Sequence, residues 1–278
     1  AVNILKKNLC NIVTSCSEDH LDWLPKNDRT IERIIFEKTS SLLNSNIVVA
    51  KQSSHKITEC IKQNISNNSA NKYYFNENYN FVLKENNFFY YEDKYGGLKI
   101  PMPNLKGQFQ LENASTAVAT LRILDDIEIK DQHIINGIQK ASNIARLEEI
   151  KSGKLKDLVK NNTLILDSSH NPGGARALND YLQTLDCNKH LIIGMMANKD
   201  HEKYISCFKD ISSITTIDIP NQPNSISGEK LKEKFKNACN VKYKESIEQA
   251  IKSIPLKEND TLIITGSLYL SGEFLKLN

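Results

Sequence analysis

Several short segments of this 278-residue chain place polar and ionisable side chains directly after apolar runs, where they could carry chemistry. The first is Leu166-Asp-Ser-Ser-His-Asn-Pro172. Asp167, leaving a strand, could accept hydrogen bonds from ribose hydroxyls, and the His and Asn that follow could reach a phosphate or a metal-bound water. The alternative is a capped turn, in which Asp167 and Asn171 only satisfy backbone donors and Pro172 opens a helix.

A second such segment is Gly194-Met-Met-Ala-Asn-Lys-Asp200. Its Lys199 and Asp200 could bind and orient an anionic substrate, or Asp200 could simply cap a helix at a surface turn. A third, Thr265-Gly-Ser-Leu-Tyr-Leu270, follows the last apolar run and combines a glycine that permits a tight turn with a serine suited to capping. Without a ligand, both segments are ordinary starts of helices.

Three candidates lie in the first half of the chain. The segment 105–114 leads into a helix whose Asn113 could read an adenine edge through its paired donor and acceptor, or could face solvent. His20, after an apolar run, could ligate a metal, although a single histidine is also common as a satisfied polar residue. Lys38 is a charge in the mostly apolar stretch Ile-Ile-Phe-Glu-Lys, from which its long side chain could also reach water.

The second half of the chain predicts the framework that would position these residues. Short apolar runs alternate with amphipathic segments, which is typical of a doubly wound α/β domain with parallel strands covered on both faces. Ligands bind beyond the carboxyl ends of such strands, where the polar segments lie. The expected strands are 163–167, 191–194, 214–219 and 261–265, and the expected helices are near 173–185, 200–209, 227–238 and 245–253.

The first half is more mixed. We expect strands at 11–15 and 46–50, short antiparallel strands within 72–100, and helices at 29–43, 108–124 and 131–141. Asn27 or Asp28 is the expected N-cap of the first helix. The aromatic residues of 72–100 favour a small sheet over a low-complexity linker.

Composition excludes several classes of protein. The chain is 40% hydrophobic and 25% charged with a net charge of +3, which gives no support to a nucleic-acid or membrane partner. Arginine, the residue suited to bidentate phosphate contacts, is scarce, so Arg146 and Arg176 gain interest. No run approaches the roughly 20 apolar residues of a membrane helix, and no secretory signal is visible. Six scattered cysteines without a C-x-x-C pair favour the reducing cytoplasm over a disulfide framework.

Taken in chain order, the polar segments resemble the folylpolyglutamate synthase and dihydrofolate synthase family, a branch of the ATP-dependent Mur-type ligases. The matching motifs are Asp-His at 19–20, Glu-Lys at 37–38, Gly…Gln…Asn-Ala at 107–114, Asp-Ser-Ser-His-Asn-Pro at 167–172, Lys-Asp at 199–200 and Gly-Ser-Leu-Tyr at 266–269. The His-Asn-Pro and Gly-Ser-Leu-Tyr forms favour the folate branch over the cell-wall branch.

The resemblance implies an α/β fold in two domains. Residues 1–144 would be the carboxyl-terminal part of a P-loop-type ATPase domain, the Mur ligase central domain. Residues 145–278 would be the Rossmann-like, doubly wound carboxyl-terminal domain. We expect the ligands to meet the polar ends of its strands, as in other doubly wound sheets.

The resemblance also implies an activity. In this family ATP phosphorylates a carboxylate of folate or dihydropteroate to an acyl phosphate, which the amine of L-glutamate then attacks, a reaction of folate biosynthesis and one-carbon metabolism. The implied cofactors are ATP and Mg²⁺, the implied location is the cytoplasm, and the runner-up substrate is a cell-wall precursor. By the same resemblance, the catalytic residues would be Lys38, as a carbamylated lysine, together with His170, Lys199 and Asp200. Asn113 would read adenine, Asp167 would bind ribose, and Arg146 and His170 would lie at the nucleotide phosphates. Ser267 and Tyr269 would line the cleft, and His20 would ligate Mg²⁺.

The chain departs from the family pattern in one large respect. It contains no G-x-x-x-x-G-K-[ST] motif, whose backbone amides cradle phosphates and which in this family lies upstream of the residue where this chain begins. A chain that begins at Ala1 rather than Met is expected to be a truncated or processed product, active only if an upstream segment or a separate polypeptide supplies that loop. The alternatives are an inactive remnant and a retained binding module.

Smaller departures are Ala145 in place of the glycine before Arg146, Phe109 where a histidine is common, and Ser168-Ser169 in place of Gly-Ala. The sequence leaves open whether one glutamate or several are added, whether Lys38 is carbamylated, and the oligomeric state.

Overall fold

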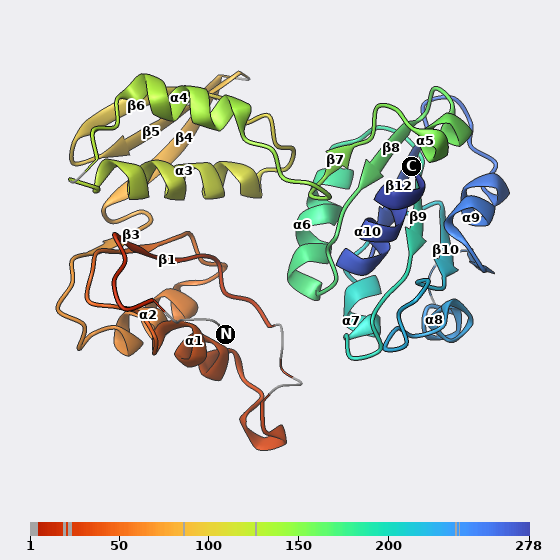
Figure 1. Ribbon diagram of the computed structural model, residues 1–278, viewed down its shortest axis with the longest axis horizontal. Coiled ribbons are helices and arrows are strands. Elements are labelled where there is room, and N and C mark those ends of the chain that lie inside the picture. Colours follow the sequence, from red (N-terminus) through yellow and green to blue (C-terminus); the bar gives the residue numbers. More distant parts are fainter. Residues whose placement is uncertain are drawn as a thin grey trace. The chain divides into compact units, whose positions relative to one another are not determined.

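The computed structural model describes residues 5–18, 21, 24–85, 87–125, 127–236, 238 and 240–278. It divides into two compact units (Figure 1). The first unit consists of residues 1–104 and 108–142, and the second of residues 105–107 and 143–278. No helix in the described part of the chain is both long and apolar enough to cross a bilayer.

The first unit begins with a three-stranded parallel sheet in the order β1-β2-β3, formed by β1 (Asn11–Val13), β2 (Ile47–Val49) and β3 (Lys72–Tyr74). Helices α1 (Ile31–Thr39) and α2 (His55–Asn64) cover one face. There Val13, Ile47 and Val49 pack against Ile35 and Ile61 in a single apolar cluster. Because the three strands are parallel, their carboxyl ends lie at one edge of the sheet.

The second part of the first unit is an antiparallel sheet that shares one helix with the first sheet. Its strands are β4 (Tyr79–Glu85), β5 (Phe88–Asp93) and β6 (Gly96–Pro101), and its helices are α3 (Phe109–Arg122) and α4 (Asp131–Lys140). Helix α3 packs against β2 as well as against β4 and β5 (Figure 1). It is therefore buried on several sides, and its low-polarity run Ala114 to Thr120 has only one exposed position.

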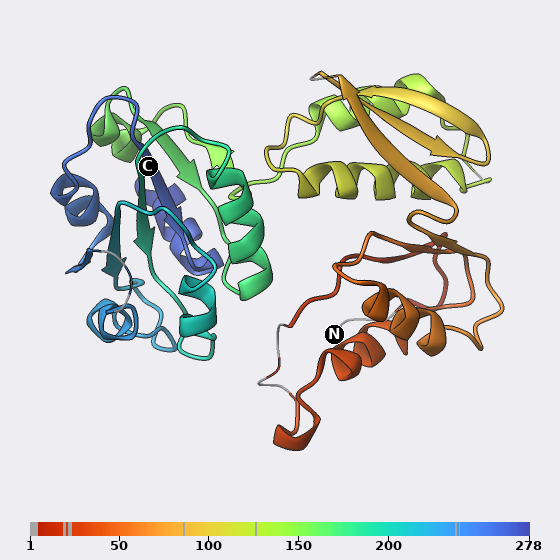
Figure 2. The ribbon, with the colours of Figure 1, turned by 180° about the vertical axis from the view of Figure 1, so that it is seen from behind.

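The second unit is a six-stranded sheet in the order β11-β10-β9-β12-β8-β7, with helices on both faces (Figures 1 and 2). All neighbours are parallel except the edge strand β7, which runs antiparallel to β8. Its strands are β7 (Glu148–Glu149), β8 (Thr163–Leu166), β9 (Lys189–Ile193), β10 (Ser213–Ile217), β11 (Val241–Lys244) and β12 (Thr261–Thr265). Every residue of β9 and β12 is buried, as expected for continuous apolar runs between two helical layers.

The helices of the second unit form two sets. One set packs together on one face and comprises α5 (Lys154–Val159), α9 (Ile247–Ser253) and α10 (Leu268–Leu277). The other set comprises α6 (Pro172–Leu182), α7 (His201–Ile205) and α8 (Gly228–Lys234). The predicted α/β fold with a doubly wound carboxyl-terminal part is thus confirmed.

The structure corrects several details of the sequence interpretation. The N-cap of α1 is Thr30, whose side chain accepts from the Arg33 amide, and not Asn27 or Asp28, which lie in a short 3₁₀ turn. Strand β3 joins the parallel sheet and not the antiparallel one. Helices α2 and α5 and strands β7 and β11 were not predicted, because they are short or have few fully buried positions.

Candidate functional site

Three loops at the carboxyl edge of the second-unit sheet carry the predicted motifs. They follow β8, β12 and β9, three neighbouring strands. Buried hydroxyls join them: the Tyr204 hydroxyl lies 3.2 Å from the Ser169 carbonyl and 2.9 Å from the Thr265 Oγ1. Ser168 Oγ also donates to Ser271 Oγ at 2.9 Å. The two serines that replace Gly-Ala therefore have hydroxyl partners, which no local pattern of the sequence indicated.

Asp167 is buried and uses both carboxylate oxygens on backbone donors. Oδ2 accepts from the Leu147 amide at 3.0 Å, and Oδ1 accepts from the Ser169 amide at 2.9 Å. Hydrogen bonds to an ionised carboxylate are among the stronger ones in proteins. The arrangement is the capped turn considered as the alternative for this segment, and it ties the loop after β8 to the turn before β7.

The turn before β7 presents Arg146 between two strained residues. Ala145 has φ +55° and Leu147 has φ +50°, both in the left-handed region that side chains other than glycine rarely adopt. The turn is held by the Ala145 amide donating to Glu148 Oε2 at 2.7 Å and by the Ser168 amide donating to the Ala145 carbonyl at 2.8 Å. The Arg146 side chain is half-buried.

Within the described residues, the Arg146 guanidinium has neither an ion pair nor a hydrogen bond. A partly buried arginine without such a partner is a ready site for an anion, since its planar fork matches a phosphate or carboxylate. Ala145 occupies the position of the family's glycine, and its positive φ explains why glycine suits that position.

His170 and Asn171 complete the loop after β8. His170 Nδ1 lies 3.0 Å from the Ser168 carbonyl and is the donor there, because a carbonyl oxygen only accepts. Asn171 caps α6, with Oδ1 accepting from the Gly174 amide at 2.8 Å, and Pro172 stands at the start of the helix. The structure thus brings Arg146, Asp167 and His170 onto two adjoining, hydrogen-bonded segments.

The loop after β9 carries Lys199 and Asp200. Asp200 caps α7 by accepting from the Lys203 amide at 3.1 Å, and its other oxygen lies 3.6 Å from the Lys203 ammonium. Asp200 therefore has the geometry of a helix cap, the alternative considered for this segment. The next residue, His201, is buried, and burial lowers its pKa, opposed by the hydrogen bond between its Nε2 and the Met196 carbonyl.

The loop after β12 depends on glycine. Gly266 has φ +108°, and a Cβ there would lie 2.7 Å from the Gly194 carbonyl oxygen. Ser267 caps α10 by accepting from the Tyr269 amide at 3.1 Å. Tyr269 is half-exposed. Gly266 therefore allows the loops after β12 and β9 to approach closely.

The first unit carries Asn113 and Lys38. Asn113 lies in the first half of α3, exposed, and its amide donates to the buried Gln110 Oε1 at 3.1 Å. Gln110 therefore fixes which edge of the Asn113 amide remains available, a positioning role that the one-turn spacing could have suggested.

Lys38 lies exposed in the last turn of α1, without an ion pair among the described residues. It is near the loop after β1, because its charge lowers the pKa of Cys16, which burial raises overall. Gln52 anchors the same loop: its Oε1 accepts from the Cys16 amide at 2.9 Å, and its Nε2 donates to the Thr14 and Ala50 carbonyls. His20, the expected metal ligand, lies outside the described residues, and those described contain no group of three side chains suited to a metal ion.

Comparison with known proteins agrees with the motifs. Residues 145–268 match the Mur ligase, glutamate ligase domain family. The dihydrofolate synthase/folylpolyglutamate synthase of Escherichia coli is 24% identical over 282 residues, which span 100% of this chain and 61% of that protein.

Two solved structures show the same fold. A structure of Mycobacterium tuberculosis folylpolyglutamate synthase complexed with ADP and AMPPCP matches with a TM-score of 0.83 at 19% identity, covering 99% of this chain and 64% of the other. A bifunctional synthase from Yersinia pestis, complexed with AMPPNP and a Mn ion, matches with a TM-score of 0.80 at 23% identity, covering 99% and 62%. The chain thus spans less than two thirds of the length of these relatives. The resemblance predicted from the motifs is confirmed: residues 145–268 match the Mur ligase, glutamate ligase domain family, and the whole chain is similar to part of the dihydrofolate synthase/folylpolyglutamate synthases.

Proposed function

We propose that this chain forms part of an ATP-dependent ligase that adds L-glutamate to folate or dihydropteroate through an acyl phosphate. The relatives carry that activity in their names, and two of them were solved with adenine nucleotides. The observation that carries the proposal is Arg146, whose half-buried guanidinium has no hydrogen bond or ion pair among the described residues and stands on a strained turn that is hydrogen-bonded to the loop of His170. Such a group stabilises the negative charge that phosphoryl transfer concentrates on oxygen.

Each remaining residue receives a role that its surroundings support. We assign to Asn113 the edge of adenine, because Gln110 fixes its amide. His170, whose Nδ1 donates to the Ser168 carbonyl, would contact the phosphates by donating from a protonated Nε2. Lys199 would hold an anionic substrate. Asp167 would act chiefly by holding the Arg146 turn, and a ribose contact would have to share its two engaged oxygens.

Lys38 would serve as the carbamylated lysine, since its ammonium is exposed and unpaired among the described residues. Reaction of its neutral amine with carbon dioxide would form an N–C bond and release a proton, turning a cation into an anion. Among the described residues no group of three His, Cys, Asp or Glu side chains could hold a metal ion. The thiols of the five described cysteines are unpaired, in keeping with the proposed cytoplasmic location.

The activity requires a phosphate-binding loop that these 278 residues do not contain. The edge of the parallel sheet offers a place for additional polypeptide, because β1 pairs only with β2 within the described chain and its Ile12 is 47% exposed. We propose that the loop comes from polypeptide that extends the sheet at β1, either upstream in the same gene product or separate. A separate polypeptide as the source of the loop would be excluded if the full gene product ligates glutamate while this chain, mixed with a second polypeptide that carries a phosphate-binding loop, does not.

The proposal is tested by calorimetric titration of ATP, with Mg²⁺, into the 278-residue chain and into Arg146→Ala. Arg176→Ala is the matched control, because it removes an exposed arginine of the same unit. We expect the Arg146 variant to bind at least about tenfold more weakly, corresponding to the loss of a charge-assisted contact. Equal affinities of the two variants would remove the observation on which the proposal rests.

A further inference from the structure

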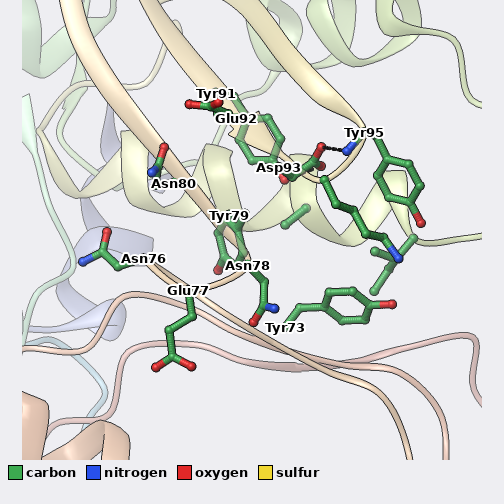
Figure 3. Close-up of a pocket in the computed structure, with 13 residues that line it drawn as sticks. Tyr73, Asn76, Glu77, Asn78, Tyr79, Asn80, Tyr91, Glu92, Asp93 and Tyr95 are labelled. Carbon is green, nitrogen blue, oxygen red and sulfur yellow. Dashed lines mark hydrogen bonds between the residues drawn. The ribbon is translucent and has the colours of Figure 1, made fainter.

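A cavity of about 370 Å³ opens in the first unit, away from every residue assigned above (Figure 3). Its lining comes from β3, the turn before β4, the start of β4, the end of β5, the turn after β5, and the end of α3. Four tyrosines, three carboxylates and three asparagines contribute, together with Lys94, Ala119 and Ile123. A concave site that mixes aromatic walls with a few polar groups is the usual form of a small-molecule site.

Tyrosine rings form two walls of the cavity. Tyr79 and Tyr91 are stacked with centroids 6.2 Å apart, and Figure 3 shows Tyr73 and Tyr95 on the other side. The hydroxyl of Tyr79 donates to the Val49 carbonyl, and that of Tyr91 donates to the Asp93 carboxylate. Burial raises the pKa of Tyr79 to about 12, so this ring stays neutral. The π faces of such rings attract cations, and the Arg122 guanidinium already lies 5.6 Å from the centroid of Tyr91, so Tyr73 and Tyr95 are the rings a ligand cation would approach.

A lysine of the chain already lies over the rings of Tyr73 and Tyr95. Lys94 is the one cationic residue among those lining the cavity, and its ammonium lies 4.8 Å from the ring centroid of Tyr95 and 5.5 Å from that of Tyr73. It stands in the exposed turn between β5 and β6. One end of the cavity therefore holds an ammonium group supplied by a side chain that can withdraw into solvent.

The other end needs hydrogen-bond donors. The Asn80 Oδ1 is buried and accepts no hydrogen bond from the described residues. Asn80 stands opposite Glu92 in the β4–β5 register, and the Glu92 side chain is exposed. A buried acceptor without a donor is costly, so a ligand that brings N–H groups would be favoured there.

We propose that this cavity binds an aliphatic polyamine. One ammonium would donate to Asn80 Oδ1 and pair with Glu92, and a second would replace the Lys94 ammonium between Tyr73 and Tyr95. The methylene chain would lie against the tyrosine rings and the apolar side chains of α3. An uncharged planar ligand would bring no positive charge to pair with the exposed Glu92 carboxylate.

The test is calorimetric titration of spermidine into the 278-residue chain at about 0.15 M salt, where long-range surface attraction is screened. We expect Tyr95→Ala to weaken binding about two- to fivefold, the worth of an exposed cation–π contact, and Asn80→Ala to weaken it further. Lys94→Ala should tighten binding about threefold, because it removes the internal competitor. Tyr90→Ala is the control, because Tyr90 is on the same strand but does not line the cavity.

Three results would overturn the proposal. These are an absence of saturable spermidine binding to both the unsubstituted chain and Lys94→Ala, equal weakening by Tyr95→Ala and Tyr90→Ala, and displacement of spermidine by MgCl₂ at equal ionic strength. Binding of inosine in place of spermidine would show a planar-ligand site and refute the polyamine. Circular dichroism of each variant separates loss of binding from loss of fold, because Tyr95 and Lys94 are exposed and their replacement should leave the unit folded.

Discussion

Comparing Asp167→Ala with Arg146→Ala separates two functions of the Arg146 turn, which are to stabilise the second unit and to bind an anion. Asp167 joins the turn to the loop after β8 by accepting from the amides of Leu147 and Ser169, at 3.0 and 2.9 Å. Hydrogen bonds to a charged group are worth about 1.5–3 kcal/mol each, so losing both should lower the free energy of unfolding of the second unit by about 3–6 kcal/mol. Arg146→Ala breaks no hydrogen bond or ion pair within the described chain and should lower that free energy far less than Asp167→Ala does, by about 0.5 kcal/mol.

The assay is hydrogen exchange resolved by peptide across a urea series, because a chain with two compact units need not unfold in a single step. It reports the second unit separately from the first. Both variants should also lose affinity for ATP, Arg146→Ala directly and Asp167→Ala through the released turn. The reasoning is refuted if Asp167→Ala exchanges in the second unit at the same urea concentration as the unsubstituted chain. It is also refuted if Arg146→Ala destabilises that unit as much as Asp167→Ala does.

Three further predictions concern the second unit. Gly266→Ala should destabilise it by more than about 2 kcal/mol, because the residue has a positive φ and a Cβ there would contact the Gly194 carbonyl oxygen. Gly272→Ala is the control in chemical denaturation: a Cβ at this helical position would meet nothing within 4 Å, so the change should be neutral or stabilising by up to about 1 kcal/mol. Burial lowers the pKa of His201, so the folded state binds fewer protons than the unfolded chain. Stability should therefore fall as the pH drops below the ordinary histidine pKa of about 6.5, and His201→Gln should abolish this loss in thermal melts between pH 8 and pH 5. Tyr204→Phe, which removes a buried hydroxyl bonded to two loops, should cost about 1–3 kcal/mol, and an unchanged melting temperature would show that this network contributes nothing.

Local patterns predicted the second unit well. The runs at Leu191–Gly194 and Thr261–Thr265 are continuous and apolar, and such runs form strands only where both faces are covered. The polar segment after each run then had to lie at one edge of a parallel sheet. The first unit was predicted less fully, because its parallel strands are three residues long and α2 has only Ile61 fully buried.

The sequence by itself determined the resemblance to the folate–glutamate ligases, most strands and helices of the second unit, and the polar segments that follow its strands. Tertiary structure decided what each side chain does: Asp167 meets an amide 20 residues upstream, and Ser168 meets a hydroxyl 103 residues downstream. It also left Arg146 without a hydrogen bond or ion pair in the described part of the chain and gathered four tyrosines around one cavity. Hydrophobic periodicity is set by neighbours along a strand or helix, whereas these hydrogen bonds join residues that only the packing of the sheet brings within 3 Å.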